Sequence, residues 1–335
     1  MAGLGMICVW YNQIMTVAER TKYISDSYNI NAVYAARLLH EYGDVSDEKL
    51  QEVISKKPKP FVKWVGGKRQ LLQQFKDRGF YPPASFNPAQ NTYFEPFVGG
   101  GAVFFDLLPL KANINDINTE LVITYNVIKN NVHDLIEELT HSGYIYDKEV
   151  FLDIRAWQTE TISDLKRAAR FIYLNRTAFN GMYRVNKSGQ FNVPFGRYTN
   201  PQICDSVNLI KVSKVLTHTQ INNKSYKYVL DEAKSSDFVY FDPPYYPVSK
   251  TASFTAYSND VFLQKEQEEL RDTFIELHKR GCFVMLSNSD TPFIESLFAP
   301  YKKDGITIHK VTAGRNINAK ASGRGKIYEI LVNNF

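Results

Sequence analysis

The chain contains the stretch Asp237-Phe-Val-Tyr-Phe-Asp242-Pro243-Pro244-Tyr245, and this stretch decides the fold prediction. Its first five residues are mainly β-branched or aromatic, which is typical of a strand buried inside an α/β sheet. Asp242 would then stand at the carboxyl end of that strand, where open α/β sheets bind ligands. The two prolines that follow exclude a helix or a strand ladder and stiffen the turn.

The same stretch predicts a binding site. A stiff turn holds the Asp242 carboxylate and the main-chain carbonyls after it as a fixed group of hydrogen-bond acceptors. Tyr245 adds an aromatic face beside them. Acceptors next to a flat ring suit a planar substrate with an exocyclic amine, such as adenine or cytosine. An ordinary strand end with a proline turn would also explain these residues, so other motifs have to decide.

Composition indicates a globular protein with one large or two ordinary domains. The 335 residues are 44% hydrophobic and 22% charged. The formal net charge of +5 permits a polyanionic partner without requiring one. Cys8, Cys204 and Cys282 lie far apart without metal-ligand spacing, which predicts a reducing compartment and no metal. The apolar opening, Met1–Trp10, is too short to span a bilayer, so we expect a cytoplasmic protein with no membrane partner.

The region 1–57 is predicted to form a helical extension of unknown role. An apolar stripe at residues 30–38 has helical spacing, and Gly43 follows it. A helix-turn-helix around residues 29–31 is the alternative. The basic, proline-rich run Lys56–Pro60 marks the boundary of this region.

A first glycine-rich turn reads Lys63-Trp64-Val-Gly-Gly-Lys68. Its two glycines let the backbone approach a ligand closely. Trp64 can stack on a flat group, and Lys68 can pair with a carboxylate or a phosphate. The spacing is not that of a P-loop, and a surface turn with a tryptophan in the core explains the stretch equally well.

A second turn reads Glu95-Pro-Phe97-Val-Gly99-Gly-Gly, between a predicted strand and a predicted helix. This is the arrangement of the first βα turn in a nucleotide-binding sheet, although the glycines are not spaced as in dinucleotide-binding proteins. The next predicted strand, 112–116, ends in Asp116, whose two oxygens can accept hydrogen bonds from both hydroxyls of a ribose. A helix-entry cap is the alternative role for Asp116.

Residues 131–220 interrupt the alternation of strands and helices. Within them the segment 175–198 mixes arginine, asparagine and aromatic side chains, with glycines at turn spacing. Such a mixture can supply phosphate contacts, base reading and stacking. A β-hairpin with a solvated face is the alternative, but the interleaving of these residue types favours nucleic-acid contact.

Two loops complete the pattern of candidate ligand contacts. Residues 246–260 form a long polar loop, which is typical of a functional lid. Residues 314–326 are rich in glycine and basic side chains and are suited to phosphates, although an exposed solubilising loop would look the same. The strands expected on either side of this second loop, 306–311 and 326–332, are predicted to pair.

Together these stretches resemble Dam-type DNA adenine-N6 methyltransferases, and they look closest to the streptococcal restriction–modification enzymes that methylate GATC. The resemblance covers residues 60–335 and includes the order of the motifs. It implies an α/β fold with a seven-stranded, mainly parallel, Rossmann-like methyltransferase sheet and an inserted, mostly helical recognition domain. The catalytic domain would comprise residues 58–144 and 217–335, and the target-recognition domain residues 145–216.

The resemblance also implies S-adenosyl-L-methionine as the cofactor and double-stranded DNA as the substrate. The residues that match the family's cofactor contacts are Trp64, Lys68, Glu95, Phe97, Gly99, Asp116 and Asp242. The residues that match its grip on the target adenine are Asp242, Pro243, Pro244 and Tyr245. The residues that match its DNA contacts are Lys63, Phe179, Asn180, Arg184, Pro194 and Arg197.

Three of the DNA contacts have specific implied roles. Phe179 matches the aromatic that inserts into the duplex, Arg184 matches the arginine that reads a guanine, and Lys63 matches a lysine near the first base. A tyrosine also occurs in the family at the place of Phe179. Stacking survives this difference, whereas a contact through the hydroxyl would be lost.

The implied reaction moves a methyl group to N6 of adenine within GATC, by base flipping and direct displacement. A cognate restriction endonuclease and a monomeric or weakly dimeric state belong to the same expectation. Cytosine-N4 methylation is the nearest alternative, because its amine needs the same acceptors, but such enzymes often carry serine where Asp242 stands. A DNA-binding relative without catalytic activity is the second alternative.

Overall fold

The computed structural model divides the chain into two compact units, Met1–Lys56 and Lys57–Phe335. Each unit is described by itself. The described residues are 16–28, 39, 43, 46–55, 57–87, 90–141, 143–248, 262–314 and 326–335.

The described part of the first unit is helical. It contains α1 (Val17–Ser27) and α3 (Asp47–Ser55). The two helices are joined where Arg20 donates to Asp47 at 3.0 Å. The apolar stripe predicted for residues 30–38 lies outside the described residues, as does the turn of the helix-turn-helix alternative.

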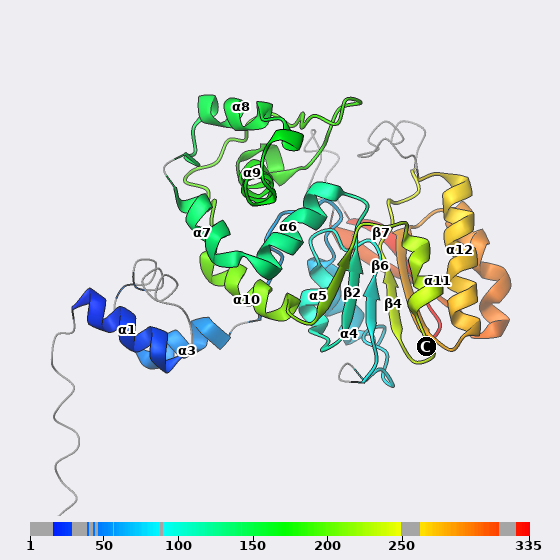
Figure 1. Ribbon diagram of the computed structural model, residues 1–335. Helices are drawn as coiled ribbons and strands as arrows, with labels where there is room; N and C mark the ends of the chain where they lie inside the picture. Colours follow the sequence, from blue (N-terminus) through cyan, green and yellow to red (C-terminus); the bar gives the residue numbers. More distant parts are fainter. Residues whose placement is uncertain are drawn as a thin grey trace, which may run out of the picture. The chain divides into compact units, whose positions relative to one another are not determined.

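In the second unit, the described residues form one seven-stranded sheet in the order β3-β2-β1-β4-β5-β7-β6 (Figure 1). Strands β1 to β5 run parallel, and β7 is antiparallel to both of its neighbours. The strand bounds are β1 Tyr93–Glu95, β2 Ala112–Asn115, β3 Thr219–Asn222, β4 Phe238–Phe241, β5 Phe283–Ser289, β6 Thr307–Gly314 and β7 Lys326–Asn333. The predicted fold class, a seven-stranded and mainly parallel α/β sheet, is confirmed.

Helices surround this sheet and also form a group of their own between β2 and β3 in sequence. Their bounds are α4 Arg69–Asp77, α5 Ala102–Leu107, α6 Thr119–Asn130, α7 Val132–Thr140, α8 Lys148–Ala156, α9 Asp164–Thr177, α10 Ser206–Leu216, α11 Val229–Glu232, α12 Gln264–Lys279 and α13 Pro292–Phe298. None of the helices in the described residues has the length and apolar content that a membrane crossing requires.

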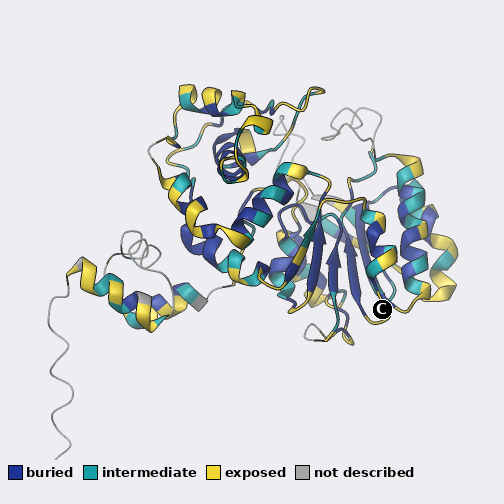
Figure 2. Cartoon of the chain, viewed as in Figure 1, coloured by how far each residue is buried: buried dark blue, intermediate teal, exposed yellow. Residues whose placement is uncertain are grey.

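Strand β4 lies in the middle of the hydrophobic core and is buried on both faces. Val239 and Phe241 belong to the cluster that includes Leu270 and Phe274 of α12. The alternate residue Phe238 points to the other face of the sheet, where it contacts the rings of Tyr81 and Tyr93. Burial on both faces explains why the strand reads as a continuous apolar run, and Figure 2 shows the central strands in the buried colour.

Among the helices between β2 and β3, α10 packs on α6 and α7, and the centre of the group is α9 (Figure 1). This helix contacts α6, α7 and α8, and most of its residues are buried. Ala168 and Ala169 are fully buried on it, and their small side chains permit close approach of the neighbouring helices. The boundaries of a separate recognition domain within this unit stay a proposal.

Candidate active site

Asp242 directly follows β4 and provides the charged group at the centre of the candidate site. Its Oδ1 lies 2.8 Å from Nζ of Lys68. This oxygen is buried, and no described residue gives it a hydrogen bond of good geometry. Burial raises the pKa of Asp242 to about 6, while the ammonium group of Lys68 opposes the rise. The site therefore holds an ionised acceptor at neutral pH that can take a further donor.

The turn after Asp242 is held by two buried amide side chains that the sequence reasoning did not identify. Gln267 of α12 donates from Nε2 to the Pro244 carbonyl at 3.0 Å. Asn288 of β5 accepts from the Tyr246 amide at 3.1 Å and donates to Oε1 of Gln267 at 2.9 Å. Because these amides also bond to each other, they fix the course of the proline turn from two directions.

Tyr245 lies beside the Asp242 carboxylate. Its hydroxyl donates to Oε2 of Glu329 on β7 at 2.7 Å. Nζ of Lys68 lies 4.8 Å from the centroid of its ring, which is a cation–π contact. Asp242, Lys68 and Tyr245 therefore form one group, in which an aromatic face stands next to a carboxylate.

Lys68 immediately precedes α4, and its side chain is 3% exposed. The sequence predicts a carboxylate or a phosphate as its partner. In this structure the partner is the carboxylate of Asp242, and the ammonium group also donates to the Gly66 carbonyl. The first glycine-rich turn is thus linked directly to the proline turn after β4.

Trp64 explains why the second turn needs glycine. A Cβ atom on Gly99 would lie 2.5 Å from Cδ1 of Trp64, and Gly99 has a φ of +48°. The indole also stacks on Tyr183, with ring centroids 6.3 Å apart and planes inclined by 19°. The sequence reasoning expected the glycines to admit a ligand, whereas the close approach at Gly99 is made by Trp64 of the chain itself.

Asp116 stands at the end of β2 and ties this strand to the glycine turn. Its Oδ2 accepts from the Gly99 amide at 3.0 Å, and its Oδ1 accepts from the Asn118 amide at 2.9 Å. The second bond corresponds to the helix-entry role that the sequence left open. A contact between this buried carboxylate and the hydroxyls of a ribose stays a prediction.

Glu95 is buried beneath the start of α5. Its Oε2 accepts from the Tyr93 hydroxyl at 2.8 Å and from the Phe104 amide at 3.0 Å. Burial raises the pKa of Glu95 to about 8, against the lowering effect of the hydrogen bond from Tyr93. These bonds give Glu95 a structural role in fixing the glycine turn and its helix, and contact with a cofactor stays a prediction.

Phe97 belongs to an aromatic group that the sequence reasoning missed. Its ring stacks on Tyr226 with centroids 5.3 Å apart, and it meets the edge of Phe262 at 5.8 Å. Tyr226 follows β3 closely, just as Asp116 follows β2. A sequence signal existed, because an aromatic residue shortly after a predicted parallel strand lies at the edge of the sheet where ligands bind.

The six residues that match DNA contacts are all exposed. They are Lys63, Phe179, Asn180, Arg184, Pro194 and Arg197. Local bonds bring several of them together: the Phe179 amide donates to the Pro194 carbonyl at 2.9 Å, and Nε of Arg184 donates to Oδ1 of Asn192 at 2.7 Å. Phe179 is 46% exposed, which is unusual for so large an apolar side chain.

The family of the chain follows from comparison with known proteins. Residues 64–317 match the family model described as D12 class N6 adenine-specific DNA methyltransferase. This range includes the proline turn, both glycine-rich turns and the exposed segment around Phe179. The chain belongs to this family.

Three named methyltransferases are similar in sequence to this family member over most of its length. The type II methyltransferase M1.LlaDCHI of Lactococcus lactis subsp. cremoris is 45% identical over 283 residues, which cover 83% of this chain and 95% of that protein. M.MjaIII of Methanocaldococcus jannaschii is 42% identical over 293 residues, covering 83% and 99%. The DNA adenine methylase of Escherichia coli strain K12 is 32% identical over 279 residues, covering 82% and 95%.

These comparisons confirm the resemblance at the level of the family. The enzyme is an adenine-specific DNA methyltransferase, and its methyl donor is S-adenosyl-L-methionine. The structure fits such a donor, because Asp116 and Asp242 follow parallel strands at the same edge of the sheet and no described residue gives Oδ1 of Asp242 a hydrogen bond of good geometry. Specificity for GATC and a streptococcal relationship stay predictions.

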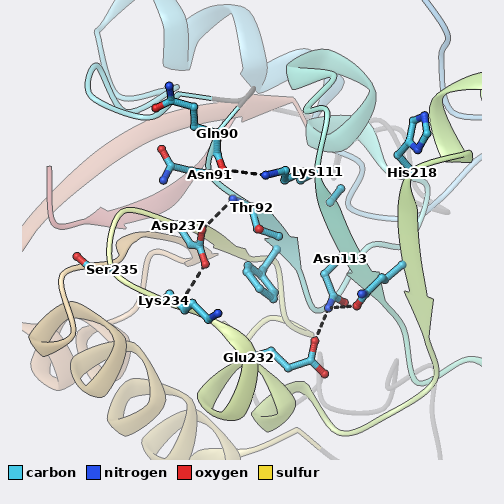
Figure 3. A pocket seen from close by; sticks show the side chains of 13 residues that line it. Gln90, Asn91, Thr92, Lys111, Asn113, His218, Glu232, Lys234, Ser235 and Asp237 are labelled. Atoms are coloured by element: carbon cyan, nitrogen blue, oxygen red, sulfur yellow. Dashed lines mark hydrogen bonds between the residues drawn. The ribbon is translucent and has the colours of Figure 1, made fainter.

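A polar pocket of about 510 Å³ lies at the opposite edge of this methyltransferase sheet (Figure 3). Its lining residues precede or begin the parallel strands. There Asp237 accepts from the Thr92 amide at 2.8 Å and the Lys234 amide at 2.9 Å, while Asn113 donates to Glu232 at 2.5 Å. These residues lie at the amino ends of the strands, whereas Asp242 follows the carboxyl end of β4, so this pocket is separate from the group around Asp242.

The two predicted loops lie mainly outside the described residues. Residues 249–260 of the expected lid and residues 315–325 of the basic loop are not described. The strands that flank the basic loop, β6 and β7, pair as predicted. Cys204 and Cys282 are buried, and Cys8 is outside the described residues.

Proposed function

We propose that this methyltransferase acts on an adenine flipped out of double-stranded DNA, within the sequence GATC. The observation that carries the proposal is the buried Oδ1 of Asp242, which receives no hydrogen bond of good geometry from the described residues and whose ion-pair partner, Lys68, lies over the ring of Tyr245. An adenine inside a duplex cannot reach such a group, and flipping costs a few kcal/mol. The stacking face of Tyr245 offsets part of that cost.

Asp242 and the proline turn would orient the target amine. Gln267 already occupies the Pro244 carbonyl, which leaves the Pro243 carbonyl as the second acceptor next to the Asp242 carboxylate. Two acceptors on the N6 hydrogens raise the electron density on nitrogen and aim its lone pair. The methyl donor supplies an electrophilic methyl group on a sulfonium. As the new bond to N6 forms, the bond between this methyl and sulfur would break, so that the donor leaves as a neutral thioether, and the extra proton on N6 would be released to solvent.

Lys68 would change partners during binding. The target amine takes its place at Oδ1 of Asp242, where Nζ now lies 2.8 Å away. The released ammonium group can then pair with the carboxylate of the methyl donor, which is the anionic partner that the sequence predicts. Tyr245 keeps its orientation in this exchange, because its hydroxyl is held by Glu329.

The remaining cofactor contacts are assigned to the edge of the sheet around β1 and β2. Asp116 would bind the ribose hydroxyls through its free lone pairs, and Trp64 with the turn at Gly99 would line the methionine end. Phe97 and Glu95 belong to the same proposed set. We add Tyr226 and Phe262, because they stack with Phe97 and so extend the apolar surface that a nucleoside base needs.

The exposed segment around Phe179 is assigned to DNA. Phe179 would insert next to the flipped base, Arg184 would read a guanine, and Lys63 would read the first base. Asn180, Pro194 and Arg197 complete the proposed contact surface. The support for GATC is the match of this segment to Dam-type enzymes, together with its exposure.

The biological setting is proposed from the relatives. The proteins from L. lactis and M. jannaschii are named type II methyltransferases, which supports a restriction–modification role and with it a cognate endonuclease. A monomeric or weakly dimeric state remains part of the proposal.

The two aspartates that flank β4 provide a matched test. Asp242→Asn removes the charged acceptor, and kcat should fall by about 10²–10³-fold while DNA affinity changes little. Asp237→Asn alters a buried aspartate at the other end of the same strand, where the carboxylate only bonds to main-chain amides. This control should lower the melting temperature without a comparable loss of kcat. Near-normal turnover by Asp242→Asn would refute the assignment.

The target sequence is tested with labelled methyl donor on duplexes in which each base pair of GATC is replaced in turn. Nucleoside mass spectrometry of the product separates N6-methyladenine from N4-methylcytosine. Methylation of duplexes that lack GATC would refute the specificity, and N4-methylcytosine would favour the cytosine alternative.

A further inference from the structure

Lys63 lies in a segment without regular secondary structure that precedes α4. Its neighbours Phe61 and Val62 are 1% and 4% exposed, so the backbone here runs close to the core. Backbone groups in such a place need hydrogen-bond partners. Asn175 of α9 supplies them: its Oδ1 accepts from the Lys63 amide at 2.8 Å, and its Nδ2 donates to the Lys63 carbonyl at 2.8 Å.

Asn175 makes a third bond that reaches the recognition segment. The same Nδ2 donates to the Gly181 carbonyl at 2.8 Å. Gly181 ends the short 3₁₀ turn Phe179–Gly181, which presents the exposed phenylalanine. Asn175 is fully buried, and both of its amide hydrogens and its oxygen are used. One side chain therefore connects Lys63 to the turn that carries Phe179.

The side chain of Lys63 is guided by the same turn. A Cβ atom on Gly181 would lie 2.4 Å from Cδ of Lys63, so the aliphatic part of the lysine lies directly on the glycine backbone. The ammonium group then lies 4.3 Å from the centroid of the Tyr198 ring. Arg176, the residue after Asn175, adds a bond to the Phe61 carbonyl at 2.6 Å. These contacts hold both the backbone and the side chain of Lys63 in one position.

We propose that Asn175 is a positioning residue for DNA sequence discrimination. By clamping Lys63 to the Phe179 turn, it sets the distance between the base pair that Lys63 reads and the point where Phe179 enters the duplex. Recognition by hydrogen bonds depends on placing the reading group within about 0.5 Å. This inference rests on the proposed DNA contacts of Lys63 and Phe179.

The chain contains a matched control for this clamp. Asn208 of α10 is also buried, and it holds the backbone of Lys59 in the same way. Its Oδ1 accepts from the Lys59 amide at 3.0 Å, and its Nδ2 donates to the Lys59 carbonyl at 2.9 Å. The ammonium group of Lys59 pairs with Asp205 at 3.1 Å, and this lysine is not among the proposed DNA contacts. Asn208→Ala therefore removes an equivalent clamp elsewhere.

The experiment measures kcat/KM on the cognate duplex and on duplexes with each base pair replaced, for the full-length chain. Lys63→Gln first identifies the base pair that Lys63 reads, as the position where discrimination falls. Asn175→Ala should then lose about tenfold in discrimination at that same base pair and little at the others. Asn208→Ala should keep the discrimination of the unaltered enzyme at every position, although its melting temperature should also fall.

Two further variants make the result decisive. Lys63→Gln combined with Asn175→Ala should show no additional loss at the identified base pair, because Asn175 acts through Lys63. Asn175→Ser keeps a small hydrogen-bonding group and should show an intermediate loss at the same position. This variant replaces Asn175→Ala in the comparison if the alanine form does not fold.

Several outcomes would overturn the inference. The same pattern of discrimination in the Asn175 and Asn208 variants, or an equal fall in discrimination at all base pairs, would show that Asn175 only stabilises the fold. Unchanged discrimination in Lys63→Gln would refute the reading role of Lys63, and with it both that part of the proposed function and the inference built on it. An effect of Lys63→Gln without any effect of the Asn175 variants would refute the inference alone.

Discussion

The pKa of Asp242 depends on its surroundings and should set the lower limit of the pH range in which the enzyme is active. Burial raises the pKa of this carboxyl from the ordinary 3.8 to about 6, against the opposing charge of Lys68. The ionised form accepts hydrogen bonds from the amine, and a raised pKa means that the proton is taken up at a higher pH. We therefore expect kcat/KM for DNA, measured at saturating methyl donor, to fall as the pH drops through about 6. A flat profile from pH 5 to 8 would contradict a role for the ionised carboxylate.

Lys68→Met tests the opposing charge. Without the ammonium group 2.8 Å from Oδ1, the pKa of Asp242 should rise further, so the acid limb of the profile should move to higher pH. Lys76→Met is the control on the same helix, because Lys76 pairs with Asp106 at 2.7 Å and lies outside the proposed site. An acid limb that moves equally in both variants would show that the shift does not come from the ion pair.

At the level of single residues, the sequence predicted which side chains belong to the candidate site better than it predicted the groups that contact them. Asp242 and Tyr245 were found because the apolar strand and the two prolines are local signals. Gln267, Asn288 and Glu329 were not, since each meets the proline turn from a distant part of the chain. The sequence around a buried polar residue does not indicate which distant group its side chain will contact.

The glycine turn between β1 and α5 is an element whose shape depends on a distant side chain. At Gly99 a Cβ would meet Cδ1 of Trp64 at 2.5 Å, in a backbone with φ of +48°. Gly99→Ala should displace Trp64 and weaken binding of S-adenosyl-L-methionine by at least about tenfold, because a displaced residue in the lining of a binding site reduces affinity by about this amount. Isothermal calorimetry with the full-length chain measures this affinity.

Gly79→Ala is the control for Gly99→Ala. Gly79 also has a positive φ, +68°, but a Cβ there would meet nothing within 4 Å. Its substitution should cost about 1 kcal/mol of stability through backbone strain alone and leave the affinity for the methyl donor unchanged. Equal affinity losses in the two variants would contradict the contact with Trp64 as the cause.

Helices could be predicted from the sequence where a complete local pattern, such as helical spacing or a capping residue, was present. Leu270, Phe274 and Leu277 have helical spacing in the sequence, and all three are fully buried on α12. Asn118 precedes α6 and caps it, because its Oδ1 accepts from the Leu121 amide at 3.1 Å. The position of Trp64 against Gly99 could not be predicted, because it depends on the packing of two segments that no spacing rule connects.

For the whole molecule, the parallel sheet explains why distant motifs meet. The carboxyl ends of β1, β2 and β4 lie at one edge, so Asp116 and Asp242 come to the same side although 125 residues separate them in the printed sequence. This part of the site was predictable from strand order. The contribution of Glu329 was not, because β7 enters the sheet antiparallel between β5 and β6.

The division into two units predicts that the methyltransferase does not need its first unit. The whole sheet, its core and every proposed site residue lie within Lys57–Phe335, and the family match begins at residue 64. A chain of residues 57–335 should therefore fold by itself and retain kcat/KM on the cognate duplex within about threefold. Calorimetric melting and methylation assays of this fragment, beside the full-length chain, test the expectation. A fragment that melts cooperatively and binds S-adenosyl-L-methionine but no longer methylates DNA would instead assign residues 1–56 a part in binding the substrate.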